Sequence, residues 1–433
     1  MQTSLQGISN KAAKDKDHRF GNLYGMLNET FLKQCFAQLN KSAAPGVDRV
    51  DVYEYRINLD ENIHDLVKRL KKHSYNAKLV RRQYIPKING KLRPLGIPAT
   101  EDKILQFAAG KILEAIFEED FLDMSYGYRP GIGPQDAVRE LTRNLQFGKF
   151  IRIVEVDIKG FFDNIGHDWL IRMLERRIND KSLLRLIKKW LKAGILDTSG
   201  KVIHPATGTP QGGIISPILA NIYLHYALDL WFEKRVKSQC KGDALIIRFA
   251  DDFVCAFQNR QDAELFYGQL DERLRKFDLE VSPEKTNILQ FSKFRRKESG
   301  VFEFLGFEFR WGMSRKFNPI IKRRTSRKKL KATIAAFSDW IKSNRNSKIS
   351  ALMTTLASKY RGYWNYYGVI GNYGSLNAVY YQTTRILFKW LNRRSQKLSY
   401  NWAGFRELLR QFRIPPPVIT EKRRTHRQLE IFV

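Results

Sequence analysis

Two adjacent acidic residues stand inside an otherwise apolar stretch. Residues 246–257 read IIRFADDFVCAF, so Asp251 and Asp252 lie between two runs rich in Ile, Val and Phe. Each run has the composition of a β-strand, which predicts a hairpin with the acids at its turn. Two neighbouring carboxylates beside apolar strands are costly unless water or a cation neutralises them. The stretch alone fits either a solvated turn, where Asp is common, or a Mg²⁺ site.

A third carboxylate comes from a distant part of the chain. Residues 151–162 read IRIVEVDIKGFF and predict a strand that ends at Asp157. An unpaired carboxylate at the end of an apolar run is unfavourable, and a metal shared with the other two acids would resolve that cost. Three such carboxylates suit two-metal nucleotidyl transfer, in which cations about 4 Å apart activate a 3′-hydroxyl and stabilise the leaving pyrophosphate.

A basic hairpin is predicted upstream of the acids. Residues 79–99 read LVRRQYIPKINGKLRPLGIPA, with an Asn-Gly turn at 89–90. Lys87, Lys91 and Arg93 cluster on this hairpin. Because Lys and Arg neutralise phosphate charge, the hairpin fits a grip on a nucleotide triphosphate. A basic exposed hairpin without a ligand also fits the motif.

Two glycine-rich segments are expected to be loops. Residues 125–134, SYGYRPGIGP, contain Arg129, which fits either a phosphate or template contact or a structural role. Residues 207–221, TGTPQGGIISPILAN, predict a turn before a helix that starts at a Ser-Pro pair. Gly212 in this turn would let the backbone approach a ligand closely.

Apolar periodicity predicts the remaining elements. Residues 1–20 are polar and expected to be frayed. Residues 279–290 predict strand, turn and strand, with Lys285 near the turn, and 301–310 predict a strand pair around Gly306. Helices are expected at 21–40, 59–73, 101–121, 134–145, 168–178, 182–194, 261–277, 326–345, 348–367 and 375–398.

The charge of the chain points to a polyanionic partner. The 433 residues carry a net charge of +32, and residues 312–433 hold 26 Lys and Arg against 4 Asp and Glu. The same segment contains four tryptophans, and basic residues interleaved with aromatic ones fit a nucleic-acid surface. The alternative is a helical domain with an over-basic face.

Cysteine content and the N-terminus suggest a location. The three cysteines form no CxxC pair, so neither a zinc site nor a disulfide framework is indicated. The N-terminus has no apolar signal core, and no run reaches the length of a membrane span. We therefore expect a soluble, cytoplasmic protein.

In their order and spacing the motifs resemble a reverse transcriptase of the bacterial group II intron type. The resemblance covers nearly the whole chain. It is carried by RQYIPKINGKLRPLGIPATEDKILQ, SYGYRPGIGPQDAV, VEVDIKGFFDNI, TPQGGIISPILANIYL, IIRFADDFVCAF, LEVSPEKTNIL and FEFLGFEF, which look like successive blocks of this family. The loop SAAPGVDRVD is similar to the family's N-terminal extension. One departure is Phe249, where the family most often has Tyr; Phe keeps the ring and loses the hydroxyl.

The resemblance implies an α+β fold, a right-hand polymerase whose fingers and palm carry antiparallel sheet, followed by an all-α thumb. The implied domains are an N-terminal extension and start of the fingers (1–75), fingers and palm (76–311), a helical thumb or maturase domain (312–400) and a basic DNA-binding-like tail (401–433). The Cys/His endonuclease module of some members is expected to be absent.

The resemblance also assigns roles to single residues. Asp157, Asp251 and Asp252 match the catalytic carboxylates, which with the Ile158 carbonyl would hold two Mg²⁺ ions, replaceable by Mn²⁺. The incoming dNTP would contact Lys87, Lys91, Arg93, Phe162, as the ring that excludes a ribose 2′-hydroxyl, and Gln211. Primer and template would contact Arg129, Gly212 and Lys285. The thumb residues expected to bind RNA are Arg323, Arg324, Arg327, Lys328, Lys329, Arg361 and Trp364.

The implied function is an RNA-directed DNA polymerase that copies RNA into cDNA and binds group II intron RNA to assist splicing and retrohoming. Its expected partners are intron RNA, an RNA template with a DNA primer, dNTPs and target DNA, and its expected state is a monomer or homodimer in the bacterial nucleoid or a ribonucleoprotein. The alternatives are a splicing cofactor whose polymerase activity is dispensable and a domesticated reverse transcriptase of a defence system. A viral-type RNA polymerase is disfavoured by the bulky Phe162.

Overall fold

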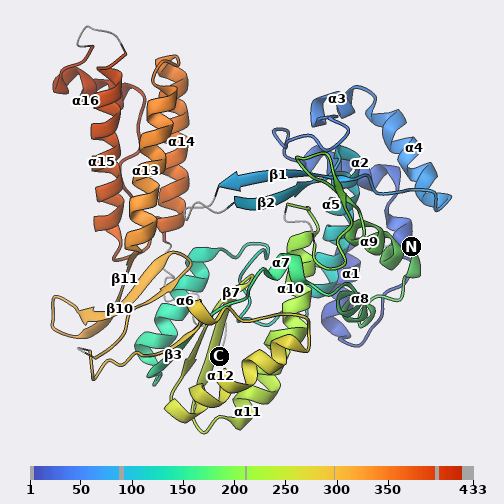
Figure 1. Cartoon of the computed structure of the whole chain (residues 1–433), viewed down its shortest axis with the longest axis horizontal. Coiled ribbons are helices and arrows are strands. Elements are labelled where there is room, and N and C mark those ends of the chain that lie inside the picture. Colours follow the sequence, from blue (N-terminus) through green and yellow to red (C-terminus); the bar gives the residue numbers. More distant parts are fainter. Residues whose placement is uncertain (1–3, 87–91, 210–211, 297, 395–398, 422–433) are drawn as a thin grey trace. The chain divides into compact units, whose positions relative to one another are not determined.

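The computed structural model describes residues 4–86, 92–209, 212–296, 298–394 and 399–421 (Figure 1). By its internal contacts the chain divides into two compact units. The first comprises residues 1–132 and 156–287, and the second comprises residues 133–155 and 288–433. The domain boundaries expected from the sequence stay predictions.

Helices and strands alternate along the chain, as expected for an α+β protein. The helices of the first unit are α1 (Leu5–Lys14), η1 (Tyr24–Met26), α2 (Glu29–Gln38), α3 (Val52–Ile57), α4 (Leu59–Lys71), α5 (Thr100–Phe117), α7 (Phe161–Asn164), α8 (His167–Glu175), α9 (Lys181–Leu191), α10 (Ser216–Leu224), η2 (His225–Asp229), η3 (Phe232–Val236), α11 (Lys237–Gln239), α12 (Arg260–Arg275) and η4 (Pro283–Lys285). Those of the second unit are α6 (Pro134–Phe147), α13 (Arg327–Asn344), α14 (Ile349–Tyr367), α15 (Tyr373–Leu391) and α16 (Trp402–Gln411). The strands are β1 (Val80–Pro86), β2 (Leu92–Ile97), β3 (Arg152–Asp157), β4 (Ile195–Leu196), β5 (Val202–Ile203), β6 (Ala244–Phe249), β7 (Asp252–Phe257), β8 (Asn287–Gln290), β9 (Phe302–Phe304), β10 (Phe307–Met313) and β11 (Pro319–Thr325).

Helix α5 is the buried axis of the N-terminal half. Most of its residues are buried, because α1, α2 and α10 pack against different sides of it.

The expectation of a frayed N-terminus was wrong. The hydroxyl of Ser4 accepts a hydrogen bond from Gly7 N and caps α1, and Ile8 and Ala12 are buried on its inner side. A polar sequence thus forms a helix because its few apolar residues share one face.

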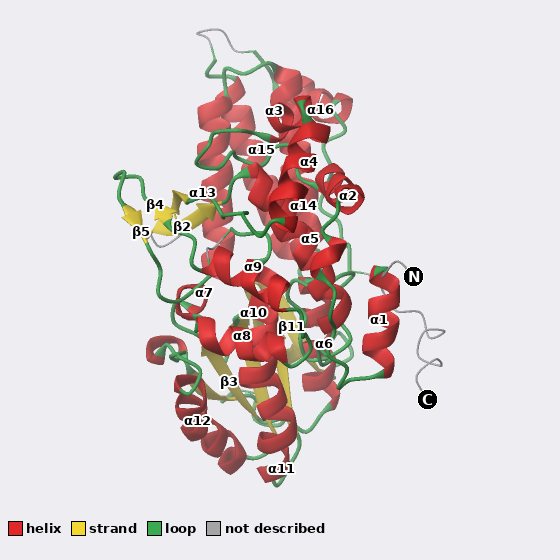
Figure 2. Ribbon diagram, turned by 90° about the vertical axis from the view of Figure 1, so that its right-hand side faces the viewer, coloured by secondary structure: helices red, strands yellow, loops and turns green. Residues whose placement is uncertain are grey.

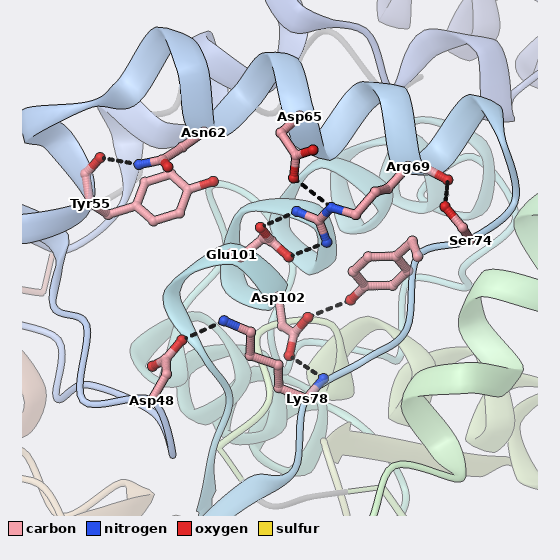
Figure 3. A network of polar contacts seen from close by, with 10 residues as sticks. Asp48, Tyr55, Asn62, Asp65, Arg69, Ser74, Lys78, Glu101 and Asp102 are labelled. Atoms are coloured by element: carbon pink, nitrogen blue, oxygen red, sulfur yellow. Dashed lines mark hydrogen bonds and ion pairs between the residues drawn. The ribbon is translucent and has the colours of Figure 1, made fainter.

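A polar network fixes the base of the β1–β2 hairpin to α4 and α5 (Figure 3). The guanidinium of Arg69 on α4 donates two hydrogen bonds, of 3.0 and 2.6 Å, to Glu101 on α5. The neighbouring Asp102 accepts from the Tyr75 hydroxyl and, at 3.1 Å, from the backbone N of Lys78. Because β1 begins two residues later, these bonds set where the hairpin leaves the helices.

The loop that reads SAAPGVDRVD, residues 42–51, also packs against the hairpin base. Arg81 of β1 donates to the carbonyl of Pro45 at 2.7 and 3.1 Å. Gly46 lies so close to Ala99 that a Cβ would overlap the Ala99 backbone. The hairpin strands pair antiparallel from Arg81 with Ile97 to Pro86 with Leu92, as predicted, and the turn lies outside the described residues.

The central sheet has the strand order β6-β7-β3-β8. β6 and β7 form the predicted antiparallel hairpin, and the apolar side chains of both strands are largely buried. Helix α12 packs against β7 (Figure 1). Most residues inside β6 and β7 are apolar, and the acids Asp251 and Asp252 lie where the two strands meet at their turn.

The second unit contains the sheet β9-β10-β11 and the helices α13, α14 and α15, which lie side by side in Figures 1 and 2. The helices follow the prediction closely, and their core includes Leu352, Tyr360, Trp364 and Leu387. The all-helical expectation after residue 312 holds from α13 onward, whereas residues 319–325 form β11. Within the described residues, no helix is long and apolar enough to cross a membrane.

His225 makes the stability of the first unit sensitive to acid. Its ring is 3% exposed, and among the described residues its Nδ1 has no hydrogen-bond partner. Burial lowers the pKa of His225 to about 4; the charge of Asp229 opposes this shift, and the cations Arg248, Lys234 and Arg129 add to it. The folded state therefore resists a proton that the unfolded chain accepts.

We predict that His225 does not reduce the free energy of unfolding above pH 6.5, its pKa in the unfolded chain. Below that pH the free energy of unfolding should fall until the pH reaches about 4, the pKa of His225 in the folded state. The loss amounts to roughly 3 kcal/mol. Thermal unfolding of the His225→Gln variant should show a weaker dependence on pH between 7 and 4.5 than wild type. The control is His204→Gln at an exposed histidine. Equal pH slopes for wild type and His225→Gln would contradict the prediction.

Candidate active site

The structure places the predicted acids at the ends of neighbouring strands. Phe249 pairs with Asp252, so Ala250 and Asp251 form a two-residue turn between β6 and β7. Strand β3, which ends at Asp157, is the neighbour of β7 in the sheet. Asp157 lies close enough to Asp251 to repel its charge. The structure therefore brings these two acids near each other, and their catalytic role stays a prediction.

Burial and repulsion act together on Asp251. Burial raises the pKa of Asp251 above the ordinary carboxyl value, and the charge of Asp157 raises it further. Its own backbone hydrogen bond and the cations Arg93 and Arg248 oppose this shift. A cation beside the carboxylates would relieve the same cost, and carboxylate oxygens are the ligands that Mg²⁺ prefers.

The metal site itself stays a prediction. Among the described residues, no three or more His, Cys, Asp or Glu side chains stand close enough together to hold a metal ion. The donor chemistry of the three acids fits Mg²⁺, but the structure does not draw them into one coordination group. Ile158, whose carbonyl was expected to be a ligand, is buried and bridges Val281. The flanking bonds run from Ser282 N to Asp157 O and from Lys159 N to Glu280 O, so neither uses the Ile158 carbonyl.

Phe162 lies beside the glycine-rich segment that leads to Gln211. The ring of Phe162 is half-buried against that of Phe161, with 5.3 Å between centroids. The Phe162 carbonyl accepts a hydrogen bond from Thr209 N at 2.8 Å. Gly208 has φ +89° and passes so close that a Cβ would lie 2.8 Å from this carbonyl. The expected sugar-excluding ring and the expected nucleotide turn therefore adjoin, although Gln211 lies outside the described residues.

The same turn also meets the basic hairpin. Gly212, with φ +107°, approaches Gly96 of β2 so closely that a Cβ would lie 2.8 Å from the Gly96 carbonyl. Ile214 N donates to the side chain of Gln106 on α5 at 3.1 Å. Arg93 of β2 is exposed, and its charge acts on Asp251. Lys87 and Lys91 lie outside the described residues, as does the side chain of Lys285.

Arg129 has a structural environment. Its side chain is 9% exposed and pairs with Glu118 at 2.7 Å. It also donates to the carbonyls of Leu122 and Ser125, at 3.1 and 2.8 Å. These bonds fix the loop before α6, and they engage the Arg129 guanidinium with other groups of the protein. A contact of Arg129 with primer or template stays a prediction.

The seven cations and aromatics expected to bind RNA divide into two groups. Trp364 is 1% exposed, stacks on Tyr360 and donates to the Pro415 carbonyl, so it belongs to the helical core. Arg323 is buried in a bidentate pair with Glu421, with both distances 3.0 Å, and Arg324 pairs with Glu308. The side chains that remain accessible are those of Arg327, Lys328, Arg361 and, in part, Lys329.

Two residues near the acids were missed by the sequence analysis. Tyr128 has φ +57°, and its ring lies 6.4 Å from that of Phe249. Burial raises the pKa of Tyr128 and the charge of Asp251 adds to this, while Arg93 opposes it. Arg248 is fully buried behind the turn. Of these two residues, Arg248 could have been found from the sequence, because a charged residue inside an apolar strand indicates a buried partner.

Comparison with known proteins gives consistent matches. Residues 85–309 match the family described as reverse transcriptase (RNA-dependent DNA polymerase). The chain is 30% identical over 465 residues to the group II intron-encoded protein LtrA of Lactococcus lactis subsp. cremoris, covering 87% of this chain and 75% of the relative. It is 36% identical over 238 residues to the protein YkfC of Escherichia coli K12, covering 48% and 62%. A solved telomerase from Candida albicans, in complex with a fragment of telomeric RNA, is similar at a TM-score of 0.44 and 14% identity, covering 84% and 68%.

The acid-bearing turn should be sensitive to one methyl group at Gly127. A Cβ at this position would overlap the Ala250 backbone nitrogen. We predict that Gly127→Ala lowers the free energy of unfolding by about 1–3 kcal/mol and speeds hydrogen exchange of residues 248–252. The control is Gly110→Ala, where a Cβ meets nothing within 4 Å. Wild-type exchange at the turn in Gly127→Ala would show that the contact is not needed.

Proposed function

The chain belongs to the reverse transcriptase family, among the proteins encoded by group II introns, and from this premise we propose that it copies RNA into DNA and binds intron RNA. The family has an RNA-directed DNA polymerase domain and acts on nucleic acid. The observation that carries the proposal is the repulsion between Asp157 and Asp251 at the ends of adjacent strands. A bound cation would relieve this repulsion, and the charge of Arg93 on the basic hairpin already acts on Asp251.

Each part of the site has a proposed task. Asp157, Asp251 and Asp252 would hold two Mg²⁺ ions, or Mn²⁺ in their place. The bound ions would neutralise the negative charge that develops on the attacking 3′-oxygen and on the leaving pyrophosphate. The ring of Phe162 would fill the space of a ribose 2′-hydroxyl and so favour dNTPs. The hairpin cations would bind the triphosphate together with Gln211. Among the described residues of the hairpin, Arg93 carries a charge that acts on Asp251.

A basic and aromatic surface of the second unit supports RNA binding. The indole of Trp390 lies 5.1 to 5.9 Å from four cationic groups. These belong to Lys342, Arg345, Lys389 and Arg393, and the described residues provide no ion pair for any of them. Four like charges around one ring repel each other unless anions neutralise them. Phosphates of intron RNA would do so, and we call this group the Trp390 cluster.

The accessible cations Arg327, Lys328 and Arg361 extend the proposed RNA surface along α13 and α14. Helices α13, α14 and α15 contain a single acidic residue, Asp339. A template–primer duplex, target DNA and the folded intron all carry the phosphates that such a surface attracts. Assistance to splicing and to retrohoming follows if the intron is the RNA that is bound.

A second candidate function is splicing assistance without need of polymerisation. The Trp390 cluster lies far from the acids in the sequence. This separation favours the second function, because RNA binding at the cluster does not require the acids. In that case Asp251→Ala would abolish DNA synthesis and leave intron splicing unchanged. A domesticated relative in a defence system would instead bind RNAs unrelated to an intron, which co-purification of cellular RNA with the full chain would reveal.

Primer extension on an RNA template with Mg²⁺ tests the polymerase. We predict that Asp251→Ala lowers the rate of cDNA synthesis by about a thousandfold, because a carboxylate at a metal site is worth several kcal/mol of barrier. The control is Asp271→Ala, an acid of α12 whose partly exposed side chain pairs with the neighbouring Arg275. Equal cDNA yield from wild type and Asp251→Ala would sink the polymerase proposal.

Salt dependence tests the Trp390 cluster. Replacing its four cations with Gln should weaken RNA binding and make the negative slope of log K against log salt shallower by about 3, because each lost phosphate contact removes roughly 0.7 to 0.9 of a unit. A double Lys11→Gln, Lys14→Gln variant on α1 removes charge elsewhere and should keep the wild-type slope. An unchanged slope in the fourfold variant would rule out the cluster as the RNA contact.

A further inference from the structure

A charged side chain is buried directly behind the acid-bearing turn. Arg248, the penultimate residue of β6, has a side chain that is 0% exposed, and so does its partner Asp229. The two are joined by hydrogen bonds of 2.7 and 2.5 Å. Burying such a pair is costly, and an apolar pair of similar volume is often as stable or more so. Fold stability therefore gives no reason for a charged pair here.

Every N–H of this guanidinium has a partner. Besides the two bonds to Asp229, Arg248 donates to Asn221 Oδ1 at 3.1 Å, to Ser125 Oγ at 2.7 Å and to the carbonyl of Ala250 at 3.1 Å. A guanidinium has five N–H donors, so its capacity is used completely. Four residues from three segments (the helix α10–η2, the loop at Ser125 and the turn itself) are tied to one planar group.

The turn needs such support because its backbone is strained. Ala250 has φ +56°, a left-handed conformation that costs a residue with a Cβ roughly 1–2 kcal/mol. Strained residues persist where the surrounding structure determines their conformation. Here Arg248 holds the Ala250 carbonyl. Asn221, which accepts from Arg248, donates at 2.5 Å to the carbonyl of Gly127, whose backbone packs against Ala250. The network thus holds the turn from two sides.

A π-helical turn brings the two acceptors onto one face. Asn221 lies in α10 and Asp229 at the end of η2, eight residues later. In a regular α-helix eight residues turn through about 800°, which leaves their side chains about 80° apart. One residue inserted by a π-turn reduces the difference to about 20°. The irregular helix therefore serves to aim Asn221 and Asp229 at the same guanidinium.

We propose that Arg248 and Asp229 are positioning residues that hold the Ala250-Asp251 turn, and with it the carboxylates of Asp251 and Asp252, in the geometry needed for catalysis. Neither side chain touches the nucleotide; both act through the turn. The proposal rests on the proposed polymerase function for its kinetic consequence. Its structural part, the fixing of the turn, stands independently of that function.

The test compares single and paired substitutions in the full chain. Arg248→Met and Asp229→Leu each leave an uncompensated buried charge and should lower the thermal midpoint. The double variant, Arg248→Met with Asp229→Leu, removes both charges and should recover most of the midpoint. We expect kcat for single-nucleotide addition to stay at least tenfold below wild type in the double variant, with KM for the dNTP changed less than threefold. The matched control is Arg177→Met with Asp120→Leu, a buried pair whose arginine also bonds residues 12 and 16 near the N-terminus; it should keep wild-type kcat.

Hydrogen exchange of peptides covering residues 248–253 reads the turn without any reaction. We expect faster exchange there in the folded double variant than in wild type or the control pair. Wild-type kcat together with wild-type exchange in the double variant would overturn the positioning role. Fast exchange at the turn with a wild type that adds no nucleotide would support the positioning role and count against the proposed polymerase function instead.

Discussion

Repulsion between carboxylates at the ends of apolar strands is the constraint around which the first unit is built. Asp157 ends β3 and Asp251 occupies the turn before β7, where burial and mutual repulsion both raise the pKa of Asp251. A fold selected for stability alone would avoid this arrangement. The arrangement makes sense where the cost is offset by bound cations, and strand ends suit it because the strands hold each acid at a fixed place.

The surroundings of the acids follow from this constraint. The turn is held from behind by a guanidinium with all donors used, and from the side by a glycine that leaves no room for a Cβ. Next to the predicted nucleotide-binding residue Gln211, Gly208 packs against Phe162 and Gly212 packs against the basic hairpin. The backbone approaches a neighbouring segment closely at Gly127, Gly208 and Gly212, which explains why these loops contain glycine there.

Much of this was predictable from the sequence, because it is local. The acid hairpin, the strand ending at Asp157 and the long helices follow from short-range patterns. Burial of Trp364 was not predictable, because an aromatic residue on a basic helix reads the same whether it faces RNA or a core. The partner of Arg248 was also hidden. Asp229 lies 19 residues away on a helix whose π-turn leaves no mark in the sequence.

We propose that the carboxylates share divalent cations when substrate is present. Counting bound Mn²⁺ by electron paramagnetic resonance in the full chain with primer, RNA template and a non-reactive dNTP analogue tests this proposal most directly. We predict about two Mn²⁺ ions per wild-type chain and fewer in Asp157→Asn, with the template–primer still bound. An equal number of bound ions in wild type and in Asp157→Asn would contradict it.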